Sequence, residues 1–401
     1  MKKMNLILSS LTLIGLLSFV GCEKNENSTN SSTKISDTTS TEKHKVTFVL
    51  NNGEDNIVRD VTHGKYASEP LKITKNNHLV DAWYTDEACE KEVWNFKVDK
   101  LTTDITLYSK WKVDYERLAW QLGRVGSKST IMLYVSFFKN QTSWEQDVNN
   151  ENSFSAGWGS GVVIAKEKDE SNNEYYYALT NNHVVTYEDE ETETMINYPR
   201  KVKIFDHYKN EYWAEVLATE NTYDLAVVKF STTPFKISSE TGGNMIYPSD
   251  PSKNPNYNED YAIKVTKFAA EDPKVGAAVS SYGSPIAQQG VCTLGKVFDY
   301  GLGCIRENPN GCSYVHEFEV IYHSASILEG NSGGPLFDVD LNLAGINYGS
   351  SGFSDTFTSS GDFQYGNFWA IPISRVREFI DKYIVDVYGA DSHYAEVLGD
   401  L

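Results

Sequence analysis

The stretch Glu329-Gly-Asn-Ser-Gly-Gly-Pro-Leu-Phe-Asp338, EGNSGGPLFD, places three glycines and a proline around one serine, Ser332. Glycines at this density mark backbone that turns sharply or that another group approaches closely. A serine hydroxyl held at such a turn is a candidate nucleophile, but it needs a base and a carboxylate that orients the base. A histidine and an acid in equally constrained surroundings are therefore expected elsewhere in the chain.

Two earlier segments meet this expectation. His183 stands in YYYALTNNHVV, where an apolar strand runs into a polar turn, and Asp224 stands in NTYDLAVVKF, at the head of an apolar strand. Taken singly, Ser332 is also explained as a hydroxyl in a tight turn, Asp224 as a cap and His183 as a satisfied core histidine. Their joint occurrence, in the order His, Asp, Ser, favours nucleophilic catalysis.

Many short apolar runs with turn residues between them predict an all-β sandwich or barrel architecture. Six candidate strands precede residue 245 and six follow it: 131–138, 159–165, 175–185, 200–206, 211–219, 225–230, 277–283, 290–300, 318–326, 333–338, 342–349 and 367–372. The Pro/Asn/Tyr-rich segment 241–261 between the two sets predicts a long loop. In 374–388 an apolar face predicts one helix that packs on the second set, formed by Val376, Phe379, Ile380, Tyr383 and Val387.

The motifs TNNHVV, YDLAVVKF and GNSGGPLF resemble the three catalytic motifs of the chymotrypsin-fold serine endopeptidases, in particular bacterial members of the high-temperature-requirement type. GWGSGVVI ahead of His183 and GNFWAIPISRV before the last helix resemble the same family, so the resemblance covers roughly residues 125–388. It implies a mainly β fold with two six-stranded antiparallel barrels and a C-terminal helix. The site lies in the crevice between the barrels, and neither a metal nor an organic cofactor is expected.

The resemblance also implies the role of each catalytic group. Ser332 attacks the scissile carbonyl and forms an acyl-enzyme, His183 transfers the proton, and Asp224 orients and stabilises the imidazole. The backbone N–H groups of Gly330 and Ser332 are expected to form the oxyanion hole. Asn331 stands where pancreatic-type relatives carry an aspartate that captures a newly cut N-terminus, so no zymogen cleavage is expected.

Substrate recognition is implied by the same resemblance. The base of the primary pocket falls near Ser326 and its wall near Asn347-Tyr348-Gly349. Because Ser326 carries no charge, a small or medium apolar substrate side chain is expected rather than lysine or arginine. The substrate is expected to pair as an extra strand along residues 344–348. The acidic run TYEDEETET, 186–194, either disfavours acidic peptides or is simply a solvated loop.

The N-terminus predicts export. Lys2 and Lys3 precede an apolar core that ends in FVGC at Cys22, which resembles the lipobox of bacterial lipoproteins, although Phe19 replaces the commoner leucine. The resemblance implies a signal peptide over 1–21 and lipidation of Cys22, so that acyl chains anchor the protein in the membrane. An uncleaved transmembrane helix is the alternative. Residues 22–44 are rich in Ser, Thr, Asn and charge, which predicts a disordered tether.

Residues 45–112 have the texture of short strands and resemble an internalin B-type repeat, a small β-grasp-like module of bacterial surface proteins. The matching features are VTFVLNNG, AWYTD and TLYSKW, with Ala82 in place of a central glycine. In that family such modules act as spacers or weak binding domains, so the sequence leaves open a surface partner for this segment. Trp83, Trp94 and Trp111 are expected in its core.

The net charge and the cysteine and histidine residues limit which binding partners, disulfides and metal sites are expected. A formal net charge of −19 argues against nucleic-acid binding and against electrostatic adhesion to anionic lipid. Cys304 and Cys312 bracket a Gly/Asn/Pro-rich loop, and either a disulfide or unpaired thiols is consistent with this spacing. No metal site is expected, and six further histidines lack a partner motif and are interpreted as structural or solvated: His44, His63, His78, His207, His316 and His323.

The sequence therefore predicts a serine endopeptidase that hydrolyses protein or peptide substrates outside the bacterial cytoplasm, anchored in the cell membrane by lipid at Cys22. Its protease domain is expected over 113–401, with no PDZ domain after the last helix. The alternative is a surface binding protein that uses residues 45–112, with an inactive protease fold as scaffold. The physiological substrate and the oligomeric state are not determined by the sequence.

Overall fold

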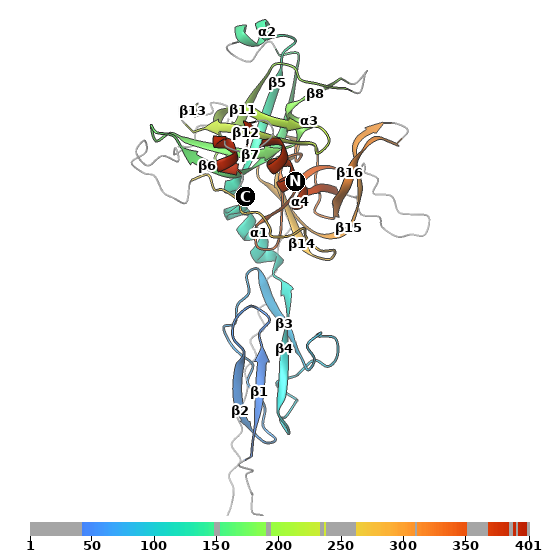
Figure 1. Ribbon diagram of the computed structural model, residues 1–401. Coiled ribbons are helices and arrows are strands. Elements are labelled where there is room, and N and C mark those ends of the chain that lie inside the picture. The colour runs from blue at the N-terminus through green and yellow to red at the C-terminus, as the bar shows by residue number, and fades with distance from the viewer. Residues whose placement is uncertain are drawn as a thin grey trace, which may run out of the picture.

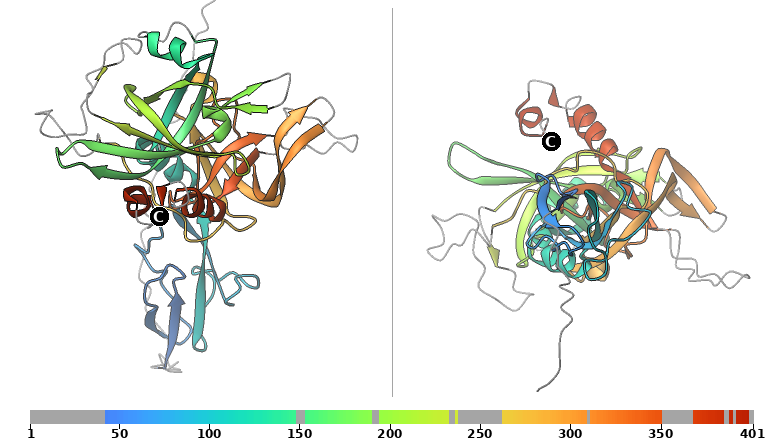
Figure 2. Two further views of the ribbon diagram at one scale, coloured as in Figure 1. Left: turned by 45° about the horizontal axis from the view of Figure 1, so that its top comes forward. Right: turned by 90° about the horizontal axis from the view of Figure 1, so that it is seen from below.

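The computed structural model describes residues 42–147, 153–189, 194–232, 236–237, 262–308, 311–350, 368–384, 388–389 and 392–398. An elongated N-terminal module leads into a larger body of two β-barrels, and the module extends from that body as a stalk (Figures 1 and 2). The signal segment 1–21, Cys22, most of the tether 22–44 and the loop 241–261 lie outside the described residues.

The stalk is a four-stranded mixed sheet. Its strands are β1 (Lys43–Val49), β2 (Ile57–Thr62), β3 (His78–Tyr84) and β4 (Ile105–Val113), in the order β2-β1-β4-β3 with β1 and β4 parallel. Alternate residues of β1 point inward, and Val46 and Phe48 are fully buried beside Trp83. The expectation of a core tryptophan is confirmed for Trp83, whereas Trp94 is partly buried.

The stalk is joined to the body by more than the chain itself. Strand β4 ends at Val113, and the side chain of the next residue, Asp114, caps the first turn of α1 (Tyr115–Arg124). Asn77, in the turn before β3, is fully buried, and its amide donates to Gln121 Oε1 and to the Val339 carbonyl at 2.7 Å each. These bonds hold one end of the stalk against the base of the second barrel.

The first barrel contains the six strands that the sequence predicts before residue 245, namely β5 (Thr130–Phe137), β6 (Ser155–Lys168), β7 (Glu174–Thr180), β10 (Arg200–Phe205), β11 (Asn210–Glu220) and β12 (Leu225–Ser231). Their order is β10-β5-β6-β7-β12-β11, and β10 also pairs with β11, so the ring closes. The short strand β13 (Lys236–Ile237) extends the sheet at β11. Smaller elements surround the ring: η1 (Gly126–Ser129), α2 (Gln141–Gln146), α3 (Asn182–Val185), β8 (Tyr187–Asp189) and β9 (Thr194–Ile196).

The second barrel contains the six later strands, β14 (Ala278–Gly283), β15 (Val291–Asn308), β16 (Gly311–His323), β17 (Pro335–Phe337), β18 (Leu343–Ser350) and β19 (Phe368–Pro372). They form a closed barrel in the order β14-β15-β16-β19-β18-β17. Strands β15 and β16 are longer than the sequence predicts, and their hairpin projects from the barrel wall (Figure 1). The fold class of two six-stranded antiparallel barrels after a small β module is therefore confirmed.

The C-terminal segment contains α4 (Ile373–Phe379), the π-helical turn η4 (Ile380–Ile384) and α6 (His393–Leu398). Val376, Phe379 and Ile380 are buried, but their cluster draws residues from both barrels rather than from the second alone. The ring of Tyr223, from the first barrel, lies 6.4 Å from that of Phe379. The helix thus closes the seam between the barrels, and Val387 lies outside the described residues.

Within the described residues, none of the helices combines the length and the apolar character that a membrane span requires.

Candidate active site

The first barrel presents the candidate base. Strand β7 is buried up to Thr180, and α3 begins immediately afterwards, so His183 emerges at the point where the strand leaves the barrel wall. Val184 and Val185 are buried on the inner side of α3, while the His183 side chain is 36 % exposed. The imidazole is therefore fixed at its base and open to solvent at its edge.

Asp224 contacts His183 at two points, one on the backbone and one on the imidazole ring. Its Oδ1 accepts the His183 backbone N–H at 2.9 Å, and its Oδ2 lies 2.8 Å from His183 Nδ1. Asp224 is only 2 % exposed and adopts a left-handed φ of 50°, a conformation that Asp tolerates better than most residues. Because the carboxylate accepts a hydrogen bond from Nδ1–H, the lone pair of the neutral ring lies on Nε2, which is the tautomer a general base requires.

The same carboxylate changes the proton affinity of the ring. Burial alone would lower the pKa of His183, but the charge of Asp224 and its hydrogen bond outweigh burial, so the pKa is raised above the usual 6.5. Glu188 adds a smaller effect in the same direction.

The turn Leu328–Asn331 carries the candidate oxyanion hole. The Asn331 N–H donates to the Leu328 carbonyl at 2.9 Å, and Gly330 has a φ of +95°, which defines a type II turn. The Glu329 carbonyl accepts from the Ile286 N–H at 2.8 Å. Because C=O and N–H point in opposite directions across a trans peptide, the Gly330 N–H faces away from Ile286. Among the described residues, no acceptor pairs with the N–H of Gly330 or of Ser332.

One buried serine of the first barrel holds this turn. Ser160, in β6, donates its hydroxyl to the Gly330 carbonyl at 2.7 Å and accepts the Ser284 N–H at 2.9 Å. Its backbone N–H donates to the Ser332 carbonyl at 2.8 Å. Ser160 therefore ties both ends of the Gly330–Ser332 segment to the barrel that carries His183. Sequence reasoning missed this role, although the motif GWGSGVVI contains the residue.

The loop that carries Ser332 also lies directly against strands β6 and β7 of the first barrel. A Cβ on Gly333 would lie 2.2 Å from the Ser160 carbonyl and 2.3 Å from Thr180 Oγ1, which only glycine avoids. The structure thus brings Ser332 beside the end of β7. The Ser332 hydroxyl donates to the Tyr348 carbonyl at 3.3 Å, and among the described atoms it makes no hydrogen bond with His183. Long catalytic hydrogen bonds that tighten with substrate are common in free enzymes.

Strand pairing corrects the predicted substrate edge. Gly345 and Ile346 are paired with β17 on one side and with β19 on the other. Asn347 exchanges two backbone hydrogen bonds with the nucleophile loop, to Gly333 and Gly334. An incoming strand therefore cannot pair along 344–348, and the edge of β18 beyond Asn347, residues 348–350, is the part that β17 leaves uncovered.

The predicted pocket residues have different environments. Asn347 is fully buried, and its amide donates to Ser281 Oγ and to the Gly334 and Pro335 carbonyls, so its side chain supports the loop rather than a substrate. The Tyr348 ring is 5 % exposed and stacks on Trp369 at 5.9 Å. Ser326 is exposed, and its carbonyl accepts the Thr293 hydroxyl.

Two further histidines lie close to these elements. The His316 ring from β16 is buried 4.9 Å from Tyr348 and donates through Nδ1 to the Thr222 carbonyl at 3.1 Å, next to the turn that carries Asp224. Burial lowers its pKa against the opposing charge of Asp224. His323 is fully buried, and burial lowers its pKa to about 3, so the ring remains neutral. Both are structural, as the sequence predicts.

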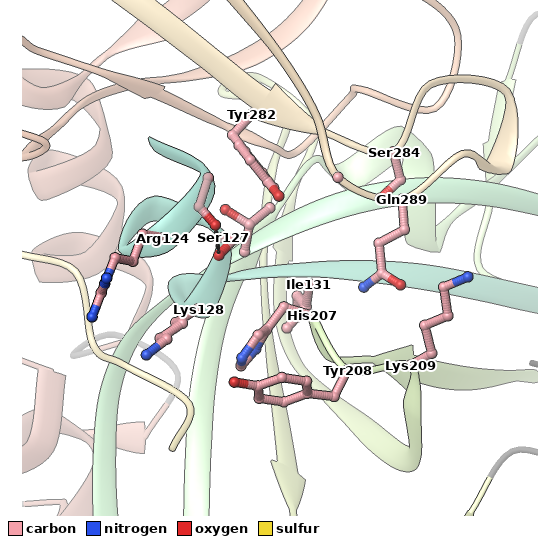
Figure 3. A pocket seen from close by; sticks show the side chains of 13 residues that line it. Arg124, Ser127, Lys128, Ile131, His207, Tyr208, Lys209, Tyr282, Ser284 and Gln289 are labelled. Atoms are coloured by element: carbon pink, nitrogen blue, oxygen red, sulfur yellow. Dashed lines mark hydrogen bonds between the residues drawn. The ribbon is translucent and has the colours of Figure 1, made fainter. Parts of the chain in front are cut away.

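A cavity of about 500 Å³ lies behind the loop that contacts the oxyanion turn (Figure 3). Its walls come from α1 and η1, the β10–β11 turn and the segment 282–290. Arg124, Lys128 and Lys209 line it together with His207. None of His183, Asp224 and Ser332 does, so this hollow is not the catalytic crevice.

The cysteines divide into two groups. Cys304 is disulfide-bonded, whereas Cys89 and Cys292 are free. In the β15–β16 hairpin, Cys304 pairs with Val315 and Glu307 pairs with Cys312. Cys304 and Cys312 therefore lie on neighbouring strands of the same hairpin. The Cys312 side chain lies outside the described residues, so its pairing with Cys304 stays a prediction.

Comparison with known proteins agrees with the geometry. Residues 159–346 match the family model of the trypsin-like peptidase domain, and residues 44–110 match that of the Listeria-Bacteroides repeat domain. The segment 159–346 is thus similar to the trypsin-like peptidases, and the two six-stranded barrels described above have the chymotrypsin-like fold.

Several known proteins are similar to parts of the chain. It is 30 % identical to a probable periplasmic serine endoprotease DegP-like of Pseudomonas fulva over 224 residues, 56 % of this chain and 34 % of that protein. It is 25 % identical to the serine protease Do-like HtrA of Bacillus subtilis over 228 residues, 57 % of this chain and 39 % of that protein. A putative Gly-rich membrane protein of Evansella cellulosilytica is 31 % identical over 78 residues, 20 % of this chain and 9 % of that protein. The chain thus spans well under half the length of these relatives.

The pKa of His183 should report the Asp224 carboxylate. In the free protein we expect imidazole NMR to give a pKa above 6.5, and in Asp224→Asn a value below 6.5, because burial then opposes only the smaller effect of Glu188. Glu188→Gln, which removes the weaker charge, should lower the pKa by less. A pKa that Asp224→Asn leaves unchanged would contradict the described contact. Since the base must be neutral, the acid limb of kcat/KM should lie above pH 6.5.

Ser160 should position the oxyanion turn. Ser160→Ala removes the hydroxyl from the Gly330 carbonyl and leaves the Ser284 N–H without its acceptor, at a cost of about 1–3 kcal/mol. We expect kcat to fall by about tenfold or more with KM little changed. Ser280→Ala is the matched control, because the hydroxyl of this buried serine has no hydrogen-bond partner among the described residues. Equal kcat values for Ser160→Ala and Ser280→Ala would contradict the positioning role of Ser160.

Proposed function

We propose that the chain is an extracytoplasmic, lipid-anchored serine endopeptidase that cleaves peptide bonds through an acyl-enzyme on Ser332. The observation that carries this proposal is the double contact of Asp224 with His183, next to a turn whose N–H donors are unpaired among the described residues. A carboxylate, an oriented imidazole, a hydroxyl and free donors are the complete set of groups that acyl transfer by a serine requires. The DegP-like and HtrA names of the relatives support the same reaction class.

In the proposed mechanism, Ser332 Oγ turns from the Tyr348 carbonyl toward His183 Nε2 when substrate binds. Nε2 takes the hydroxyl proton as Oγ attacks the scissile carbonyl, and the new oxyanion accepts the N–H groups of Gly330 and Ser332. The imidazolium, stabilised by Asp224, then gives its proton to the leaving amine as the C–N bond breaks. A water activated in the same way releases the acyl group. Removal of one oxyanion donor costs about 3–4 kcal/mol in comparable enzymes.

The proposed substrate is an extended segment of protein that adds to the barrel as a strand. Its backbone pairs with the uncovered edge at residues 348–350, and pairing of this kind depends little on sequence. The uncharged Ser326 near the pocket favours a small or medium apolar side chain at the cleaved bond.

No activating cleavage is proposed. The turn at Gly330 already has the φ of +95° that directs its N–H away from Ile286. Asn331 is buried and carries no charge that would capture a new N-terminus. The intact chain is therefore the proposed active form.

The proposed organisation has four parts: a signal over 1–21, a tether over 22–44, a repeat over 45–112 and a protease over 113–401. Lipid on Cys22 holds the chain to the cell membrane, and the stalk lifts the protease away from its anchor. The bonds of Asn77 support this spacer role, because they fix the stalk to the body.

Reaction with a fluorophosphonate probe tests the proposed activity. Intact wild-type chain should label at Ser332 and cleave unfolded protein substrates, whereas Ser332→Ala should lose labelling and at least about 10⁴ in kcat. Asp224→Asn should lose about 10⁴ in kcat with folding retained. Wild-type chain that never labels, yet binds a surface partner through residues 45–112, would support the alternative of a binding protein on an inactive protease scaffold. Activity that appears only after a cut near residue 125 would contradict the absence of a zymogen.

Cell fractionation tests the proposed anchor. Wild-type chain should sediment with membranes and incorporate labelled palmitate, because two or more acyl chains give stable anchoring. Cys22→Ser should abolish palmitate incorporation, and Cys89→Ser should leave it intact. Palmitate incorporation that persists in Cys22→Ser would contradict lipidation at this residue.

A further inference from the structure

Three segments of the stalk meet at the end that lies away from the protease (Figure 1). Glu42 and His44 alternate at the start of β1 and so share a face. His63 directly follows β2, and its N–H donates to the Glu42 carbonyl at 2.9 Å. Asp104 directly precedes β4 and accepts the Lys45 N–H at 2.8 Å.

The side chains of these residues converge on one point. His44 Nε2 lies 2.8 Å from His63 Nδ1, while Glu42 Oε1 is 3.9 Å from His44 Nε2 and Glu42 Oε2 is 3.9 Å from His63 Nδ1. One ligand atom from each of the three residues lies within 4.8 Å of the other two. The His44 side chain is 9 % exposed, that of His63 41 % and that of Glu42 64 %. The cluster is therefore buried on the side of His44 and accessible to solvent on the side of Glu42.

We propose that this cluster is a Zn²⁺ site with His44 Nε2, His63 Nδ1 and the Glu42 carboxylate as ligands and water in the fourth position. Two ligands that each lie 2.0–2.1 Å from Zn²⁺ at the tetrahedral angle are about 3.3 Å apart. The separations of 2.8 and 3.9 Å bracket that value, so small side-chain rotations suffice. Two imidazoles and one carboxylate suit Zn²⁺ better than Mg²⁺ or Ca²⁺, which prefer oxygen alone.

Asp104 lies next to the ligand cluster and faces the second ring nitrogen of His44. Its Oδ1 lies 3.8 Å from Nδ1 of His44, the ring nitrogen that faces away from the ligand cluster. Histidine ligands usually donate their second ring N–H to a carboxylate, which fixes the tautomer and aims the other nitrogen at the metal. A hydrogen-bonded histidine pair alone would require neither this carboxylate nor Glu42, which lies equally far from both rings.

Zn²⁺ at this site would link the start of β1, where the chain enters the stalk from the tether, to the end of β2. His44 lies in β1, Glu42 directly precedes β1 and His63 directly follows β2, so the three ligands meet only when the two strands pair in their native register. The metal therefore stabilises the paired form of the stalk, because a ligand that binds only the folded state shifts the equilibrium toward it. This site is independent of the protease reaction.

Zinc titration of the full chain without an affinity tag, by calorimetry, tests the proposal. We expect one Zn²⁺ per chain with micromolar or tighter affinity, weakened at least about a hundredfold in His63→Ala and about tenfold or more in Asp104→Asn. Glu42→Gln keeps the shape of an exposed side chain and should also weaken binding. His78→Ala, a histidine of the same stalk outside the cluster, is the matched control and should bind as wild type.

Hydrogen exchange gives a local readout. At one Zn²⁺ concentration, amide exchange in residues 42–46 and 59–63 should slow in wild type and in His78→Ala, and should slow less in Glu42→Gln. Absence of Zn²⁺ binding to the wild-type chain would overturn the proposal. Equal Zn²⁺ affinity in His63→Ala and His78→Ala would place the metal elsewhere and would overturn it as well.

Discussion

The active-site arrangement depends on the hydrogen bonds that Ser160 makes across the seam between the barrels. Through its hydroxyl and its N–H, this residue holds the carbonyls of Gly330 and Ser332, so the nucleophile turn of the second barrel is positioned by the first. The contact is possible because Gly333 has no Cβ, which would lie 2.2 Å from the Ser160 carbonyl. The dense glycines around Ser332 are thus required by close backbone approach as well as by turn geometry.

The contacts that hold the acid, Asp224, against the base, His183, lie entirely within the first barrel. Asp224 is buried with a strained φ of 50° and accepts two hydrogen bonds from His183, an arrangement that the surrounding strands over-determine. The second barrel contributes His316, which holds the adjacent Thr222 carbonyl and remains uncharged because burial lowers its pKa. An added positive charge there would compete with His183 for the field of the carboxylate.

The stalk adds a mechanical constraint of a different kind. A flexible linker would let the two-barrel body take many orientations relative to the stalk, but Asn77 is fully buried in the joint and bonds to α1 and to the Val339 carbonyl, which follows β17 of the second barrel. The opposite end of the stalk carries the His44, His63 and Glu42 cluster, where the chain arrives from the tether. If Zn²⁺ binds there, both ends of the spacer are fixed by polar contacts that hydrophobic burial alone does not provide.

Local patterns in the sequence predicted the twelve barrel strands, the repeat module and the two segments that hold His183 and Asp224. They did so because period-2 burial and turn residues act over a few neighbours. Other features arise only from tertiary contacts between distant segments: the Ser160 bonds to Gly330, the α4 contacts with both barrels, and the pairing that moves the substrate edge to residues 348–350. The sequence likewise gives no sign that His44 and His63 meet, because antiparallel pairing of β1 and β2 decides which side chains face each other. Sequence alone therefore determined the elements and the candidate catalytic residues, whereas barrel closure decided their geometry, since hydrogen bonds between remote strands exist only once the rings have formed.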